Sequence, residues 1–208
     1  MKLVKLFCLS VIVAVSGCAS MSEDFVRPPL NKFVLGKTTQ SEVIAQMGAP
    51  AGENEIVLNS QQIHGIGYTN HDISSHLGEV IKTRNVTYMF YNNVLVGISG
   101  FSTYNEDSTK FDPSKVSQIV IGETTKDQVI SLLGKPSGQD IYPIISNKDQ
   151  TAITYQYNAA TFVGIFTRWH SDTAEIIFDK NDIAVKVTAI RDGVTCTLPG
   201  TTPCALSK

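Results

Sequence analysis

The feature that most constrains the fold of this chain is a segment of twenty residues that occurs twice. Residues 33–52 align with residues 119–138 at a constant offset of 86, and nine of the twenty positions are identical. Self-similarity of this kind is the signature of a repeated structural unit. Because 42% of the 208 residues are hydrophobic, the chain can bury a core, and the repeat predicts two copies of one small folded unit.

Each copy of the motif predicts a helix of about two turns. Thr39 is followed three residues later by Glu42, which is the pattern of a capping box, and Thr125 with Gln128 repeats it. Apolar residues then recur at helical spacing, so one face of each helix should pack on a sheet. A glycine and a nearby proline follow in both copies, and they are expected to end the helix.

Strand signals follow each helix. Three runs per copy are rich in β-branched and aromatic residues, and they lie at residues 63–68, 86–91, 94–101, 152–157, 174–178 and 183–190. A further short helix is expected over 113–118, because Asp112 can cap it and Pro113 suits its first turn. The fold class predicted is α+β, a tandem repeat of a module in which two short helices pack on a three-stranded antiparallel β-meander. The modules would span residues 31–104 and 112–192.

The N-terminal residues predict export and a lipid anchor. A short basic start precedes an almost wholly apolar run, residues 6–15, as in a secretory signal; a membrane-spanning helix needs about 20 apolar residues. The residues that follow the run resemble the lipobox of bacterial lipoproteins, which implies removal of the signal peptide 1–17, lipid on Cys18 and a tether over 18–30. Ala19 after the cysteine implies sorting to the outer membrane. The alternative is an ordinary cleavable signal that leaves Cys18 as a free thiol.

The remaining cysteines predict a disulfide. Loss of the signal peptide removes Cys8, and the lipid occupies Cys18, so that two thiols remain in an oxidising compartment. Cys196 and Cys204 are expected to pair and to close the C-terminal tail, residues 193–208. The alternative is a pair of reduced cysteines in that tail.

One segment combines residue types that often carry binding energy. Residues 161–170, between the first two predicted strands of the second module, hold Phe162, Phe166, Arg168 and Trp169, the single tryptophan of the chain. Aromatic residues and arginine are enriched at interface hot spots. These four residues are therefore candidates for partner binding. Three interpretations stay open: a core that folds over the sheet, a protein-binding surface, and contact with lipid or glycan.

The sequence predicts no catalytic residue, metal, cofactor or small-molecule substrate. His64, His71 and His76 fall within thirteen residues, but their spacing fits no common zinc pattern, so a solvated loop is expected. No pair of carboxylates forms a recognisable catalytic arrangement. Nucleic acid is not an expected partner, because the formal net charge is −2 and lysine and arginine do not cluster.

The second copy of the motif resembles a known family. Residues 116–136 are similar to the opening of the SmpA/OmlA/BamE family of small outer-membrane lipoproteins, and the doubled arrangement is similar to the beta-lactamase inhibitory protein fold. The resemblance implies two helices on an antiparallel sheet in each copy. The family usually has Met before the first Thr of the motif, where this chain has Lys37 and Glu123, so that this position is expected to be exposed.

The resemblance and the anchor together imply a function. The expected protein is a noncatalytic, protein-binding accessory or scaffold in cell-envelope or outer-membrane assembly, attached to the bacterial outer membrane and facing the periplasm. Its partners would be envelope or outer-membrane proteins, and adjacent modules would leave a concave sheet surface for them. The alternative is a proteinaceous inhibitor of an exported enzyme, although a free secreted inhibitor needs no lipid on Cys18.

Overall fold

The computed structural model describes residues 24–72, 74, 76–164, 166–192 and 194–198. The signal peptide, the lipidation site Cys18, the side chain of Cys196, and Cys204 lie outside the described residues. Among the residues described, no helix has both the length and the hydropathy needed to cross a membrane.

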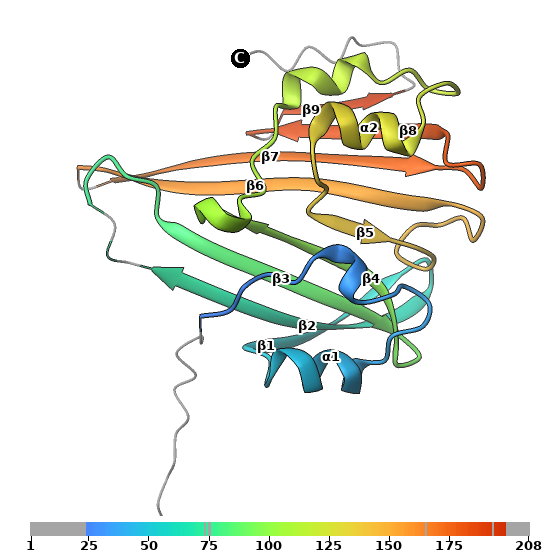
Figure 1. The fold of residues 1–208 in the computed structure, drawn as a ribbon, viewed down its shortest axis with the longest axis horizontal. Coiled ribbons are helices and arrows are strands. Elements are labelled where there is room, and N and C mark those ends of the chain that lie inside the picture. Colours follow the sequence, from blue (N-terminus) through green and yellow to red (C-terminus); the bar gives the residue numbers. More distant parts are fainter. Residues whose placement is uncertain (1–23, 73, 75, 165, 193, 199–208) are drawn as a thin grey trace, which may run out of the picture.

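The chain forms one antiparallel sheet of nine strands, in which each strand pairs with the next along the sequence (Figure 1). The strands are β1 (Gly52–Leu58), β2 (Gln61–Asp72), β3 (Lys82–Tyr91), β4 (Val94–Ser102), β5 (Gly138–Asp140), β6 (Thr151–Val163), β7 (Phe166–Phe178), β8 (Ala184–Arg191) and β9 (Val194–Leu198). The sheet is therefore a single meander, in which the connection from β4 to β5 is long and contains further helical segments.

The predicted tandem repeat of modules with two helices and three strands is wrong. The short strand β5 joins the halves, because Gln139 lies opposite Ile98 of β4 on one side and opposite Ile153 of β6 on the other. Two separate meanders would each leave a strand edge with unpaired backbone groups, and β5 satisfies both edges. Its sequence, Gly-Gln-Asp, carries no hydrophobic alternation, which is why strand patterns do not reveal it.

The repeated helices form as the capping boxes predict. They are α1 (Gln40–Met47) and α2 (Lys126–Leu133), and both capping boxes are present. Glu42 accepts a hydrogen bond from the Thr39 backbone N–H at 2.7 Å, and Gln128 accepts the equivalent bond from Thr125 at 2.8 Å. The remaining helices are short 3₁₀ turns, η1 (Leu30–Lys32), η2 (Asn105–Asp107) and η3 (Pro113–Gln118).

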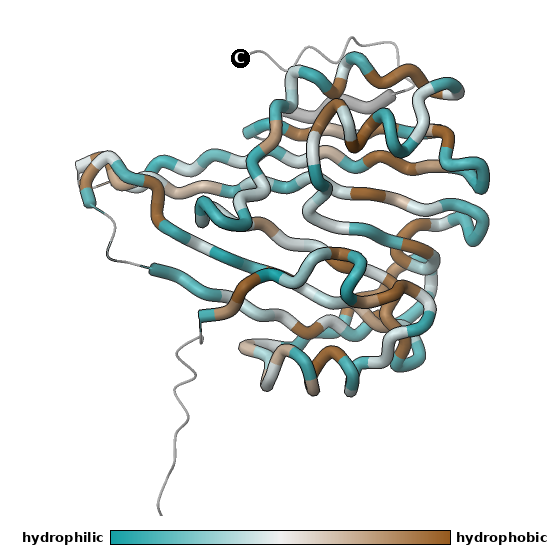
Figure 2. The backbone as a smooth tube through the Cα atoms, viewed as in Figure 1, coloured by the Kyte–Doolittle hydropathy of each residue, from teal (hydrophilic) through white to brown (hydrophobic). Residues whose placement is uncertain are grey.

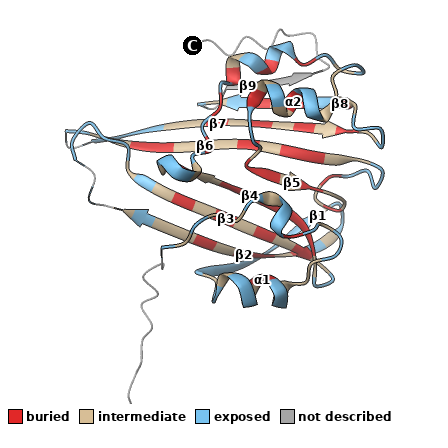
Figure 3. Cartoon of the chain, viewed as in Figure 1, coloured by how far each residue is buried: buried red, intermediate tan, exposed pale blue. Residues whose placement is uncertain are grey.

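Most of the core lies on one face of the sheet, which we call the covered face. Opposed residues in one row across the strands are buried there: Ile66, Tyr88, Ile98, Ile153, Ile176 and Val187. Both α-helices lie over this face (Figures 1 and 3), and each buries a valine, Val43 in α1 and Val129 in α2. The covered face therefore carries two apolar clusters, one under α1 and one under α2, on a single continuous sheet.

The last residues of the predicted tether belong to the folded body. Phe25 and Leu30 pack against the apolar cluster under α1, and the Phe25 ring lies edge-on to Tyr68 at 6.2 Å between centroids. The described part of the predicted tether, residues 24–30, thus packs on the sheet. Phe25 and Leu30 stand among polar residues and prolines in the sequence, so that their packing on the sheet could not be predicted from composition.

Candidate functional site

The face of the sheet opposite the helices carries few charges; we call it the open face. Within β1 to β8, the alternation of side chains places charged residues there only at Asp140, Glu175 and Lys186. Most of its other polar side chains are uncharged and half-buried, and these include Thr69, Asn85, Thr87, Ser99, Thr154, Gln156, Asn158, Thr173 and Thr188. A broad, charge-poor surface of Thr, Ser, Asn and Gln thus spans the sheet.

The open face is hollowed at one end and covered at the other. The hollow lies between β1, β2 and β3, and its lining includes Asn54, Thr69 and Thr87. At the other end, the connection between β5 and β6 folds over the face beside Gly97, where an added Cβ would lie 3.2 Å from Ile144. The surface available to a partner therefore runs from the hollow across the middle strands.

Asp140 is the buried charge of the open face. One of its carboxylate oxygens has no hydrogen-bond partner among the described residues, and the other lies 3.5 Å from the Thr154 hydroxyl. Burial, and then the charge of Glu175, raise the pKa of Asp140 to about 7, against a weaker lowering by Thr154. The carboxyl group of Asp140 therefore keeps its proton to a higher pH than an exposed aspartate does.

The second surface feature is a protruding apolar tip formed by the β6–β7 hairpin and the β2–β3 connection. Phe166 and Trp169 expose 72% and 76% of their surface, and Leu77 of the β2–β3 connection exposes 70%. Val80 and Val163 are also exposed. Figure 2 shows apolar residues gathered at this end of the molecule, at the left of the view. Exposed apolar side chains that gather at one end of a protein are candidates for contact surfaces.

Backbone hydrogen bonds hold the two parts of the tip together. The Gly78 N–H donates to the Phe162 carbonyl at 2.8 Å, and the Ile81 N–H donates to the Ala160 carbonyl at 2.8 Å. The pairing of β7 with β8 begins at Asp172, so the hairpin extends past its sheet neighbour. Its described residues therefore form a projection that is hydrogen-bonded to the β2–β3 connection.

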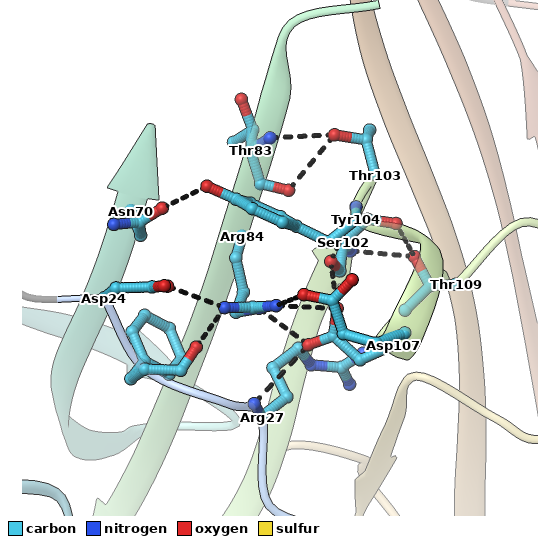
Figure 4. Close-up of polar contacts among 12 residues, drawn as sticks. Asp24, Arg27, Asn70, Thr83, Arg84, Ser102, Thr103, Tyr104, Asp107 and Thr109 are labelled. Atoms are coloured by element: carbon cyan, nitrogen blue, oxygen red, sulfur yellow. Dashed lines mark hydrogen bonds and ion pairs between the residues drawn. The ribbon is translucent and has the colours of Figure 1, made fainter. Parts of the chain in front are cut away.

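The third feature is a buried arginine that clamps the N-terminal segment to the sheet (Figure 4). Arg84 of β3 is 1% exposed, and its guanidinium bonds to Asp24 at 2.9 Å, Glu106 at 2.7 Å and Asp107 at 2.7 Å. The group also donates to the Phe25 carbonyl. Three carboxylates from two distant segments thus converge on one cation.

The surroundings of Arg84 strengthen this clamp. Its guanidinium carbon lies 4.2 Å from the centroid of the Tyr104 ring, a cation–π distance. Burial alone would lower the pKa of Arg84, but hydrogen bonding and attraction to Asp107, with help from Glu106 and Asp24, raise it above its ordinary value. The arginine stays charged, and the N-terminal segment is held where it crosses β3.

A second arginine extends the clamp toward β5. The Arg27 side chain donates to the Ser137 carbonyl at 2.9 Å, just before β5, and its backbone N–H donates to Asp107 at 3.4 Å. Burial lowers the pKa of Arg27, and the charge of Asp107 opposes that effect. The segment before α1 therefore contacts both halves of the sheet.

The predicted partner-binding residues all lie at the tip. The structure places Phe162 in β6 and Phe166, Arg168 and Trp169 in β7, so the prediction that residues 161–170 connect two strands is wrong: they extend both. Phe162 is half-buried, and the other three are exposed. The interpretation as core therefore fails for Phe166, Arg168 and Trp169.

The three closely spaced histidines do not converge. They contact different partners: His64 with Glu55 at 2.8 Å, His71 with Thr83 at 3.1 Å and His76 with Glu79 at 3.5 Å. Within the part of the chain that the structure describes, no three His, Cys, Asp or Glu side chains come together as a metal site.

Sequence patterns missed the Arg84 clamp and the open face. A signal for the clamp exists, because Arg84 is in phase with Val86, Tyr88 and Phe90 on the buried side of β3. An arginine at such a position must find charged partners, since burial of an unpaired charge is costly. The open face gave no local signal, because it arises only when β5 joins the two halves.

No protein-family model matches the chain, and no curated protein matches it. Among solved structures, the crystal structure of a Streptococcus mutans protein that is provisionally assigned as a beta-lactamase inhibitor protein aligns with a TM-score of 0.42 and 17% identity. The alignment covers 79% of this chain and 94% of that chain. At these values the similarity does not bear on function, and the resemblance to the SmpA/OmlA/BamE family gains no support.

Proposed function

We propose that this chain is a lipid-anchored, noncatalytic protein-binding accessory of the bacterial cell envelope, whose protein partner docks on the open face. The anchor is the lipid expected on Cys18, and Ala19 favours the outer membrane with the folded body in the periplasm. The partner is an envelope or outer-membrane protein.

The composition of the open face carries this proposal. Depletion of charged residues is the compositional signal of the centre of a protein–protein interface, more than bulk hydrophobicity is. Antiparallel sheets often leave one face to solvent, but soluble surfaces usually intersperse charges of both signs. Across the middle strands of this face, the charged residues are the buried Asp140 of β5 and the half-buried Glu175 of β7. Short hydroxyl and amide side chains supply adaptable hydrogen bonds to a partner backbone or side chain.

In-cell photocrosslinking tests the proposal. A photoreactive amino acid at Thr154, in the middle of the open face, is expected to give a discrete crosslinked product in intact cells. The matched control is Ser131, which is exposed on α2 over the opposite face. Equal products at both positions, or none at Thr154, would refute docking on the open face.

A charge insertion separates specific docking from chance collision. Thr173 lies opposite Gln156 on the open face. The substitution Thr173→Arg should abolish the product at Thr154, because the bound partner would have to bury the new arginine charge away from water. Ser131→Arg should leave the product unchanged. If the captured protein is an enzyme whose activity falls on binding, the chain is an inhibitor, which is the alternative that the sequence raised.

A further inference from the structure

We propose that the apolar tip docks on the surface of the lipid bilayer that holds the anchor. The proposal rests on the lipid anchor of the proposed function, but it concerns a different surface from the open face. It assigns the exposed residues of the β6–β7 hairpin and the β2–β3 connection to a membrane contact.

The tip is apolar on both of its faces. Val163 lies opposite Phe166 in the hairpin register, so these two side chains share the covered-face side. Trp169 lies opposite Ala160, with Phe162 on the same side, which is the other one. A folded protein that docks on a flat ribbon covers one side of it. A ribbon with exposed aromatic residues on both sides is suited to a medium that surrounds it.

The residue types at the tip are those of a membrane interface. Tryptophan is enriched where a bilayer meets water, because its ring is apolar and its N–H group is polar. Arg168 lies between the two exposed aromatic residues and exposes its side chain, so it can contact lipid phosphates while Phe166 and Trp169 contact acyl chains.

The N-terminal segment leaves the fold at the end of the sheet that carries the tip. Asp24 is bound to Arg84, the third residue of β3, and the β2–β3 connection of the tip ends where β3 begins, at Lys82. Figure 1 shows the start of the described chain below this end of β2 and β3. The clamp therefore fixes the exit point of the anchor relative to the tip.

The length of the intervening chain brings the bilayer within reach of the tip. Six residue steps separate Cys18 from Asp24, and at roughly 3.3–3.6 Å for each step they span about 20 Å at most. A lipid on Cys18 thus keeps the end of the sheet that bears the tip close to the membrane. Two or three acyl chains hold such an anchor almost permanently, so the tip stays near lipid.

The single tryptophan makes the contact measurable. Mature protein purified with its lipid is reconstituted in vesicles of phosphatidylethanolamine and phosphatidylglycerol, with and without brominated acyl chains. The Trp169 emission is expected to shift to the blue, and brominated lipid should quench it roughly twofold, since bromine acts only on rings at the acyl boundary. A matched reporter moves the tryptophan to the far end of the sheet, as Trp169→Phe with Lys180→Trp in the turn after β7, and it should not be quenched.

Three outcomes would overturn the proposal, and each has a different meaning. If the wild-type protein floats with vesicles but Trp169 is quenched no more than the Lys180→Trp reporter, the anchor stands and the tip does not touch lipid. If the wild type floats no better than Cys18→Ala, the anchor itself fails. If Trp169 is shielded only when an envelope protein is added to the vesicles, the tip binds protein instead. Phe166→Ser should reduce the quenching if the proposal is correct.

Discussion

The two copies of the twenty-residue motif fold alike, whereas several segments around them differ between the two halves. In each copy a threonine caps an eight-residue helix, and a tyrosine from the sheet bonds to the glycine that ends the helix. The Tyr68 hydroxyl donates to the Gly48 carbonyl at 2.9 Å, and the Tyr155 hydroxyl donates to the Gly134 carbonyl at 3.0 Å. The motif thus encodes a cap and a docking site for one helix.

The surroundings of the two helices differ. Before α1, the chain from Asp24 crosses the sheet and is held by Arg84, whereas before α2 the turn η3 buries Val116 in the neighbouring cluster. In the first half, a connection of several residues joins β2 to β3. In the second half, a tight turn joins the equivalent strands β6 and β7 into the long hairpin that bears Trp169. Similarity over twenty residues therefore specifies the helix and its cap, and the segments that precede each helix are held in different ways.

The largest effect is expected from breaking the Arg84 clamp of the first half. Arg84→Ala leaves Asp107 and its neighbours without their cation and should lower the free energy of unfolding by about 3–5 kcal/mol. Arg191, in the second half, bonds to Asp172 at 2.9 Å but is 22% exposed, so Arg191→Ala should cost clearly less. Urea denaturation of both variants measures the difference, and equal losses would mean that the clamp does not distinguish the halves.

The next effect concerns the junction between the halves. Because burial and Glu175 raise the pKa of Asp140 from 3.8 to about 7, the folded protein keeps a proton that the unfolded chain has released. The free energy of unfolding should therefore fall as the pH rises from about 4 to about 7, by an amount on the order of 3 kcal/mol, and then level off.

Two variants test the assignment of that slope to Asp140. Asp140→Asn should remove the fall between pH 4 and 7 in urea denaturation, because it cannot release the proton. Glu175→Gln should only reduce it, since burial remains the main cause of the raised pKa. A slope that persists in Asp140→Asn would assign the titration to another group.

The smallest effect should be shared by the two halves. Thr39→Ala and Thr125→Ala each remove a capping box of the same geometry, and each should cost about 1 kcal/mol. The double variant should lose the sum, because separated sites without shared partners are additive. Thermal unfolding of the three variants is the measurement. Clearly unequal losses of stability in Thr39→Ala and Thr125→Ala would show that the surroundings of each helix determine the contribution of its cap.

Sequence patterns predicted the local elements and failed on their assembly. The capping boxes of α1 and α2, the turn over 113–118 and the central strands follow from residue types a few positions apart. The single sheet depends on β5, whose three residues have no strand signal, and β1 is exposed along nearly its whole length. Pairing with the distant strand β4 determines β5, and the hairpin with β2 determines β1; neither strand has the hydrophobic alternation that would reveal it.

The candidate surfaces were predictable to different degrees. The aromatic residues of segment 161–170 stand out in the sequence. Their exposure could not be predicted, because it depends on the β6–β7 hairpin extending beyond the end of β8. The lipid on Cys18 and the disulfide of Cys196 and Cys204 stay predictions. The charge-poor open face could not be predicted, since strands of both halves contribute to it and only the complete sheet brings them together.

Native-state hydrogen exchange tests most directly whether the two halves form one cooperative body. Val129→Ala destabilises the core under α2, and amide protection can then be followed in β2 and β3, which are remote from the substitution. If the sheet unfolds as one unit, the free energy of opening in β2 and β3 should fall by the same amount as in β6 and β7. Unchanged protection in β2 and β3 would contradict a single sheet and would favour two independently folding halves.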